Sequence, residues 1–224
     1  MTIPTVASAA SALRGISHVE QVEHAEALHD LNVLHGLNIG LQLLKLKIFK
    51  YGEPVLREKS EPIAVVTEPL RSLAVDMIAT MHAAKGVGLA AQQIGHTERM
   101  CVIDIPEGCE TEADEAFNSI VQMPLVLFNP EIISRDGTQL DKEGCLSFPG
   151  IGGSVERAAQ VTCQYLDMNN MPQIVTARGF LARALQHEID HLDGILYVDR
   201  LFEDERKSFE PKLKKLSDSN GGVR

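Results

Sequence analysis

The sequence contains no tryptophan, and aromatic residues make up only 4% of its 224 residues. Because single-stranded nucleic acids stack their bases on aromatic side chains, this scarcity argues against a base-stacking surface. Basic residues are also scarce: 21 Lys and Arg stand against 31 Asp and Glu, a formal net charge of −10. This balance argues against a nucleic acid or an anionic membrane as the main partner. No apolar run approaches the roughly 18–20 residues of a membrane-spanning helix, so we expect no membrane span.

The spacing of a disulfide framework is absent as well. The four cysteines, Cys101, Cys109, Cys145 and Cys163, are scattered and form no CxxC pair. This pattern is typical of a reducing compartment and not of a disulfide-stabilised secreted domain. Cys101 and Cys163 fall in predicted strands, where we expect small buried side chains. Cys109 falls in an acidic stretch, where we expect an exposed thiol.

The most informative segment that is present is the run Gln-His-Glu-Ile-Asp-His at residues 186–191. On an α-helix, residues four apart lie on one face, so His187 and His191 can bind one metal ion. Glu188 follows the first of them, within reach of a water molecule at such an ion, as in the H-E-x-x-H motif. Motifs this short also occur by chance in helices whose histidines bind nothing, so other segments must decide between the two interpretations.

Two histidines leave such an ion in need of at least a third protein ligand. No His or Cys follows residue 191, but Cys145 lies upstream in the segment 143–147, after a predicted strand and turn. A thiolate with two imidazoles suits zinc or ferrous iron and leaves one position open for water. A third segment, residues 86–95, combines glycines with glutamine amides, which can donate a hydrogen bond to an oxyanion. It lacks the Lys-Ser/Thr pair of a phosphate-binding loop.

Three segments in this order, GVGLAAQQIG at 86–95, EGCLS at 143–147 and QHEIDHLDG at 186–194, resemble the signature motifs of the peptide deformylases. The opening KIFKYGEPVLREKSEPI at 47–63 is similar to the start of that family's domain, so the resemblance covers roughly residues 46–205. It implies an α+β fold of antiparallel or mixed strands packed around a central helix that carries the third motif. It also implies a metal-dependent hydrolase that removes the formyl group from the N-terminal formyl-methionine of new polypeptides and releases formate.

The resemblance also implies roles for single residues. The metal ligands would be Cys145, His187 and His191, with Glu188 moving the proton. Stabilisation of the formyl oxygen would come from the Gln93 amide and the backbone N–H of Leu146, with Gly88 lining the formyl site. A pocket for the methionine side chain would be surrounded by Val87, Glu143, Leu181, Ala184 and His187.

The same resemblance sets expectations for cofactor and partners. Cys and His donors suit Fe²⁺, Zn²⁺, Ni²⁺ or Co²⁺, and the family implies Fe²⁺ in the working enzyme. The partners would be N-formyl-methionyl nascent peptides, so we expect a ribosome-proximal, cytoplasmic monomer of bacterial type. An organelle matrix is the alternative compartment, because residues 1–15 are rich in Ala and Ser and contain one Arg and no acid.

Three other functions stay open at this point. The first is an H-E-x-x-H endopeptidase, which ordinarily uses a third His or a Glu as ligand. The second is a structural zinc module, which needs a fourth protein ligand. The third is an inactive relative of the family, which would bind ligands only. The chain also departs from well-known bacterial members after Ser147. Those members often carry a basic residue there, whereas the stretch 148–153 of this chain contains none. The sequence therefore does not identify the residues that contact the peptide backbone of the substrate. Three nearby arginines offer an alternative source of that charge, but we interpret each as a surface or structural charge: Arg157, Arg178 and Arg183.

Apolar spacing predicts the elements around the motifs. Amphipathic helices are expected over residues 68–84 and from about Phe180 to Leu192. The apolar face of the second would be formed by Leu181, Leu185, Ile189 and Leu192. Strands are expected at 100–105, 125–128, 160–167 and 173–176, and an exposed acidic loop at 107–115. A helix over 203–216 should break at Pro211, or a new helix should begin there, and residues 217–224 should be disordered.

We divide the chain into an N-terminal extension (1–44), a catalytic domain (45–205) and a C-terminal helix with a tail (206–224). In the extension, apolar residues recur at helical spacing from Leu28 to Leu44, interrupted by Gly36 and Gly40. This stretch is a helix packed on the domain, a weakly ordered appendage, or a segment before the true translation start. Its histidines do not share one helical face, so we expect no second metal site: His18, His24, His29 and His35.

Overall fold

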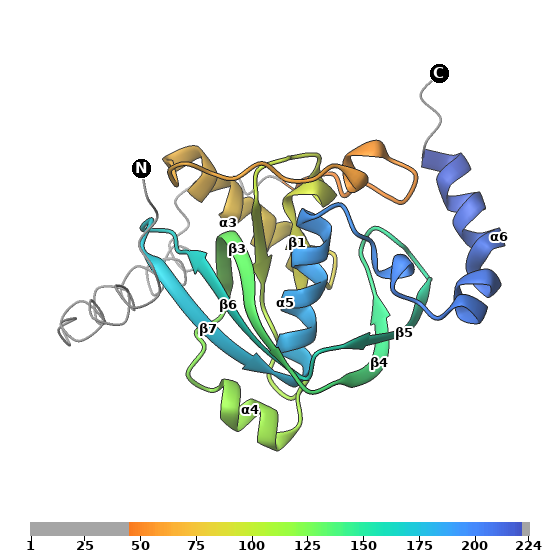
Figure 1. Ribbon diagram of the computed structural model, residues 1–224. Coiled ribbons are helices and arrows are strands. Elements are labelled where there is room, and N and C mark those ends of the chain that lie inside the picture. Colours follow the sequence, from red (N-terminus) through yellow and green to blue (C-terminus); the bar gives the residue numbers. More distant parts are fainter. Residues whose placement is uncertain (1–44, 221–224) are drawn as a thin grey trace. The chain divides into compact units, whose positions relative to one another are not determined.

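The computed structural model describes residues 45–220 (Figure 1). The expectations for residues 1–44, including the helical stretch and its histidines, lie outside the described residues, as does the end of the predicted tail at 221–224. Within residues 45–220, no helix is both long enough and apolar enough to cross a membrane.

A five-stranded sheet forms the centre of the fold, with the strand order β1-β2-β3-β6-β7. Every neighbouring pair in it is antiparallel. A separate antiparallel pair is formed by β4 (Gln139–Gly144) and β5 (Gly152–Arg157). Together with the helices, these sheets confirm the predicted α+β class. The strands of the main sheet are β1 (Gly88–Ala90), β2 (Met100–Ile103), β3 (Leu125–Asp136), β6 (Gln160–Leu166) and β7 (Pro172–Arg178).

The middle of this sheet is covered on both faces. Side chains alternate along a strand, so Cys101 and Ile103 of β2 point into one apolar cluster, whereas Met100 and Val102 point into another. Neighbouring β3 divides its apolar residues between the same two clusters. Strands that are buried on both faces lose the alternation of apolar and polar residues, which explains their continuous apolar sequences.

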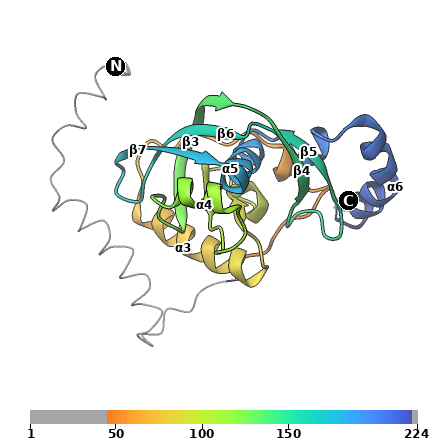
Figure 2. The ribbon, with the colours of Figure 1, turned by 90° about the horizontal axis from the view of Figure 1, so that it is seen from below.

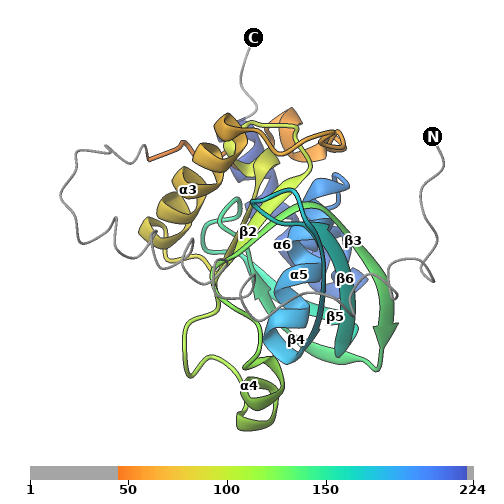
Figure 3. The same cartoon turned by 90° about the vertical axis from the view of Figure 1, so that its left-hand side faces the viewer.

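Two helices provide this cover, α5 (Gly179–Leu192) on one face and α3 (Glu68–Ala83) on the other. In Figure 3, β2 lies between them. Both match the predicted helices to within one residue at each end. The predicted apolar face of α5 is confirmed, because all four of its residues pack in the cluster between α5 and the sheet: Leu181, Leu185, Ile189 and Leu192.

The β4–β5 pair packs on a third apolar cluster, together with α6 (Glu203–Asn220), which lies beside it in Figure 2. Two short 3-10 helices, η1 (Pro54–Arg57) and η3 (Tyr197–Asp199), contribute to the same cluster. The Ser154 N–H of β5 donates a 2.9 Å hydrogen bond to a Glu205 carboxylate oxygen of α6. The cluster therefore joins the start and the end of the described chain to the second sheet.

The acidic stretch predicted as an exposed loop contains a helix, α4 (Glu112–Asn118). The Thr111 side chain caps it by accepting a hydrogen bond from the Asp114 N–H at 3.2 Å. The Glu110 carboxylate accepts a 2.8 Å bond from Asn118 and a 3.1 Å bond from the Leu181 N–H, so the segment is tied to the start of α5. The acidic composition concealed an ordinary N-cap signal at Thr111.

The prediction for the C-terminus was wrong in two respects. Helix α6 continues through Pro211, and it ends at Asn220, so residues 217–220 are helical. A proline removes one helical hydrogen bond, here to the carbonyl of Lys207, which lies in an exposed turn where water can take its place. Burial of Leu213 and packing of Phe209 and Leu216 on the third cluster outweigh that loss.

Candidate metal centre

Helix α5 presents His187 and His191 from consecutive turns, with ring centroids 5.0 Å apart. Cys145 lies in the turn that follows β4, and its Sγ is 3.2 Å from Nε2 of His191. One ligand atom from each of these three residues lies within 4.8 Å of the others. It is the one such group of His, Cys, Asp or Glu within residues 45–220. The sequence-predicted ligands therefore converge.

These donors fit a divalent metal ion, because a thiolate and two imidazoles are the ligands that zinc and ferrous iron accept. Nδ1 of His187 is 2.9 Å from a carboxylate oxygen of Glu143, which leaves Nε2 of the ring for an ion. Burial lowers the pKa of His191 well below its ordinary value, so this imidazole stays in the neutral form that binds metals. No fourth donor joins the group among the described residues, which argues against a structural zinc site.

The charge of His187 is set by its surroundings. Burial lowers its pKa, but hydrogen bonds with Cys145 and Glu143 outweigh this effect and raise the pKa well above its ordinary value. A metal ion would compete with that proton for the same negatively charged partners. The anionic surroundings that favour the imidazolium are thus the surroundings that would favour a bound cation.

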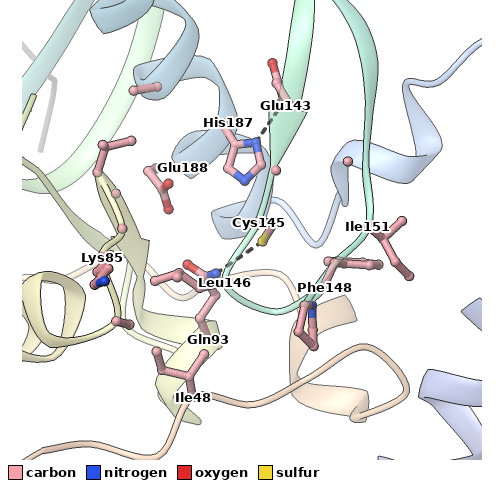
Figure 4. Close-up of a pocket in the computed structure, with 18 of the residues that line it drawn as sticks. Ile48, Lys85, Gln93, Glu143, Cys145, Leu146, Phe148, Ile151, His187 and Glu188 are labelled. Carbon is pink, nitrogen blue, oxygen red and sulfur yellow. Dashed lines mark hydrogen bonds and ion pairs between the residues drawn. The ribbon is translucent and has the colours of Figure 1, made fainter. Parts of the chain in front are cut away.

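Glu143 stands at the centre of a buried ion network behind His187. Its carboxylate accepts bonds of 2.9 and 3.0 Å from Arg157 and one of 2.7 Å from Arg183. Burial raises the pKa of Glu143, but the bonds from His187 and Arg157 prevail and hold its pKa well below the ordinary value. Arg157 also pairs with Asp190 of α5. Glu143 therefore stays an anion that fixes the ring of His187 (Figure 4).

The hydrogen bonds of the nearby arginines show which of them are structural charges and which is a surface charge. Arg157 and Arg183 are buried structural charges, whereas Arg178 is exposed and bonds with Gln160. The guanidinium groups of Arg157 and Arg183 are therefore paired with carboxylates and do not offer a free charge to a peptide substrate.

Among the described residues, Glu188 forms none of the ion pairs that surround Glu143. It is buried, and its Oε2 has no hydrogen-bond partner among the described residues. Burial raises the pKa of this carboxyl to about 7, with a smaller opposing effect of His187. Gly88 lies against it, because a Cβ placed at Gly88 would be 2.2 Å from Oε1 of Glu188. The glycine is thus required by the close approach of the carboxylate to β1.

Gln93 belongs to the 3-10 helix η2 (Ala91–Ile94), which directly follows β1. Its Oε1 accepts a 2.8 Å hydrogen bond from the Ala90 N–H, which fixes the orientation of the amide. Its Nε2 therefore points to the turn after β4 and lies 3.4 Å from Cys145 Sγ and 3.2 Å from Ser147 Oγ (Figure 4). The first and second motifs meet through this amide, beside the three candidate ligands.

A cavity of about 780 Å³ lies in front of these groups. Of the sequence-predicted site residues, those that line it are Val87, Gly88, Gln93, Glu143, Cys145, Leu146, Ala184, His187 and Glu188. Leu181 does not line it: the side chain is 0% exposed and belongs to the core between α5 and the sheet. It lies on the face of α5 that packs on the sheet, about a third of a turn around the helix from His187.

Sequence reasoning missed several residues of the cavity wall, among them Ile48, Lys50, Phe148, Ile151 and Phe180. Phe148 and Ile151 belong to the stretch after Ser147 in which the expected basic residue is absent. Lys50 reaches the wall from the opening segment of the domain, where no local pattern indicated a role. These positions are set by tertiary contacts, so no local signal could have found them.

Comparison with known proteins places these features in a family. The family described as polypeptide deformylase matches residues 45–207 of this chain. The peptide deformylase of Endomicrobium trichonymphae is 44% identical over 173 residues, which cover 77% of this chain and 96% of that protein. The peptide deformylase of Alkalilimnicola ehrlichii is 45% identical over 171 residues, or 76% and 90% of the two chains.

Solved structures of peptide deformylases also match this chain. The crystal structure of peptide deformylase from Ehrlichia chaffeensis superimposes with a TM-score of 0.70 at 36% identity, covering 79% of this chain and 98% of that chain. The peptide deformylase from Synechococcus elongatus in complex with actinonin gives a TM-score of 0.63 at 37% identity, with coverages of 79% and 88%.

Proposed function

The chain belongs to the polypeptide deformylase family, and on that basis we propose that Cys145, His187 and His191 hold its metal ion while Glu188 moves the proton. As a member, it removes the formyl group from the N-terminus of nascent peptides. The observation that supports the assignment is the convergence of one thiolate and two imidazoles beside a buried carboxylate with an unpartnered oxygen.

A divalent ion held by these three residues would supply Lewis acidity to the formyl carbonyl and to the attacking water. Glu188 takes a proton from that water as its oxygen forms the new bond to the formyl carbon. It then gives the proton to the departing nitrogen when the C–N bond breaks, so formate and a free amine result. A carboxyl whose pKa lies near 7 suits both halves of this transfer at neutral pH.

The negative charge that develops on the formyl oxygen needs donors on the other side. The Gln93 Nε2, oriented by Ala90, and the backbone N–H of Leu146 are proposed for this role. Losing one such donor typically raises the barrier by about 2.7–4 kcal/mol. Gly88 lets the formyl group approach between Glu188 and these donors.

Val87 and Ala184 line the cavity and are proposed to contact the methionine side chain of the substrate. Leu181 supports that wall from the core without contacting the cavity. Glu143 is proposed to act on the substrate only through His187, because its carboxylate is occupied by Arg157 and Arg183.

We propose Fe²⁺ as the working metal, with Zn²⁺, Ni²⁺ or Co²⁺ as substitutes that the same donors accept. The scattered cysteines support a reducing compartment, which the cytoplasm or an organelle matrix provides. Action on nascent peptides supports a place near the ribosome, and we propose a monomer whose catalytic domain begins near residue 45.

The direct test is formate release from a formyl-methionyl peptide by protein loaded anaerobically with Fe²⁺. The same peptide without its formyl group, and a longer unformylated peptide, are the controls. We expect one formate per peptide and no cleavage of the controls. Cleavage of internal peptide bonds in the unformylated peptide would instead support a metallopeptidase, and absence of both reactions would support a ligand-binding relative.

A further inference from the structure

Three consecutive residues of the opening segment hold the first and second motifs together. The Phe49 N–H donates a 2.7 Å hydrogen bond to the Gln93 carbonyl. The Tyr51 N–H donates a 3.0 Å bond to the Ser147 carbonyl. Between them, Lys50 Nζ donates a 2.7 Å bond to the carbonyl of Leu146. The segment 49–51 thus contacts the turn that carries Cys145 and the helix that carries Gln93.

The bond from Lys50 differs from the other two because it carries a charge. Lys50 lies half-buried in the cavity wall, and no carboxylate among residues 45–220 forms an ion pair with it. Its ammonium therefore directs a charge-assisted hydrogen bond at a single backbone carbonyl, and such bonds are roughly twice as strong as neutral ones.

The amide that accepts this bond also acts on Cys145. The Leu146 carbonyl and the Ser147 N–H belong to one peptide group, and that N–H lies 3.4 Å from Cys145 Sγ. A cation at the oxygen of an amide polarises its N–H, because hydrogen bonds in a chain strengthen one another. The sulfur receives a second bond, of 3.4 Å, from Gln93 Nε2.

We propose that Lys50 is a positioning residue of the metal centre, which polarises the Leu146–Ser147 peptide group and thereby draws electron density from the Cys145 thiolate. The inference rests on the proposed function, because it requires Cys145 to be a metal ligand. A thiolate that accepts stronger N–H···S bonds donates less charge to its ion, which keeps the ion a better Lewis acid. The same bond holds the turn that presents the Leu146 N–H.

The test uses the full chain loaded with Co²⁺, whose absorption contains a thiolate-to-cobalt charge-transfer band when a cysteine is bound. Lys50→Met removes charge and donor, Lys50→Gln keeps a neutral donor, and Lys50→Arg keeps the charge. Lys59→Met is the matched control, since Lys59 is exposed in the same segment. The readouts are the position of the band and kcat and KM for formate release from a formyl-methionyl peptide.

We expect the band of Lys50→Met to move to longer wavelength and its kcat to fall at least about tenfold, with KM changed much less. Lys50→Gln should show a smaller shift in the same direction, and Lys50→Arg and Lys59→Met should resemble the parent protein. If Lys50→Met fails to fold, the comparison of Lys50→Gln with Lys50→Arg still measures the effect of the charge.

The inference is overturned if Lys50→Met or Lys50→Gln keeps the parental band and kcat, or if Lys50→Arg behaves like Lys50→Met. If the parent protein binds Co²⁺ but shows no charge-transfer band, the proposed ligand set itself is contradicted. It would remove Cys145 from the ligand set, so the proposed metal centre would fall first and the role of Lys50 with it.

Discussion

At the scale of single residues, two neighbouring carboxylates have opposite surroundings. Glu143 accepts hydrogen bonds from Arg157, Arg183 and His187, so it is held as an anion and orients the His187 ring. Glu188 has an oxygen without a partner among the described residues and a pKa raised to about 7 by burial. Because its negative charge is paired, Glu143 is assigned to positioning. Because its charge is not paired, Glu188 is assigned to proton transfer.

Replacement of Cys145 by serine should abolish tight metal binding, because a neutral hydroxyl is a poor substitute for a thiolate ligand. Elemental analysis of the purified Cys145→Ser protein measures the outcome. Cys163→Ser is the matched control, since Cys163 is buried in the core between α5 and the sheet and should keep its metal. Full metal occupancy in Cys145→Ser would exclude Cys145 as a ligand.

Replacement of Gly88 by alanine should displace the Glu188 carboxylate, because the new Cβ would lie 2.2 Å from Oε1. A shift of about 1 Å in a catalytic group can cost about a hundredfold in rate, so we expect a loss of that order in kcat with metal content unchanged. Gly144→Ala is the control, because a Cβ there meets no atom within 4 Å. Equal kcat values for the two variants would contradict the close contact.

At the scale of elements, the sequence was informative wherever a pattern is local. The bounds of α3 and α5 and the apolar face of α5 follow from helical spacing alone. Bringing Cys145 to His187 requires β4 and its turn, and neither β4 nor β5 was predicted, because their mostly polar sequences lack a strand pattern. Their pairing is decided by the third apolar cluster, which joins segments far apart in the chain.

The remaining errors have the same origin. Pro211 was expected to break the helix or to begin a new one, but a single helix runs through it, because packing of Leu213 on the third cluster outweighs the missing hydrogen bond. Leu181 was assigned to the methionine pocket by resemblance, whereas its place on the helix turns it into the core. Lys50 was overlooked because its partner, the Leu146 carbonyl, lies 96 residues away in the sequence.

Helix α6 should support the cavity, because Leu213 packs in the cluster that contains the wall residues Phe148 and Ile151. We expect Leu213→Ala to lower the free energy of unfolding by about 2–3 kcal/mol, near the low end for a buried leucine, and to raise KM for the formyl peptide. Urea denaturation and steady-state kinetics measure the two effects. Exposed Lys214→Ala should change neither, and a similar stability of both variants would show that α6 does not brace the fold.

At the scale of the whole molecule, every residue placed in the site lies after residue 44, in the part of the chain that the family matches. We therefore expect deletion of residues 1–44 to leave metal content and formate release unchanged and to move the melting temperature by less than about 2–4 °C, roughly 1 kcal/mol at this length.

Deletion of residues 1–51 is the contrasting case, because it removes the bonds from Phe49, Lys50 and Tyr51 to the two motifs. This longer deletion should abolish formate release. A large drop in melting temperature already with the shorter deletion would mean that the first 44 residues stabilise the catalytic domain.

Three residues are proposed to hold the metal while Glu188 carries the proton, and Glu188→Gln separates the two roles in one measurement. Metal content and formate release are determined on the same anaerobic preparations of the parent and the variant. We predict full metal occupancy with a turnover lowered by at least about a hundredfold, since glutamine fills the same space but cannot accept the proton. Loss of the metal together with the activity, or an unchanged turnover, would contradict this division of roles.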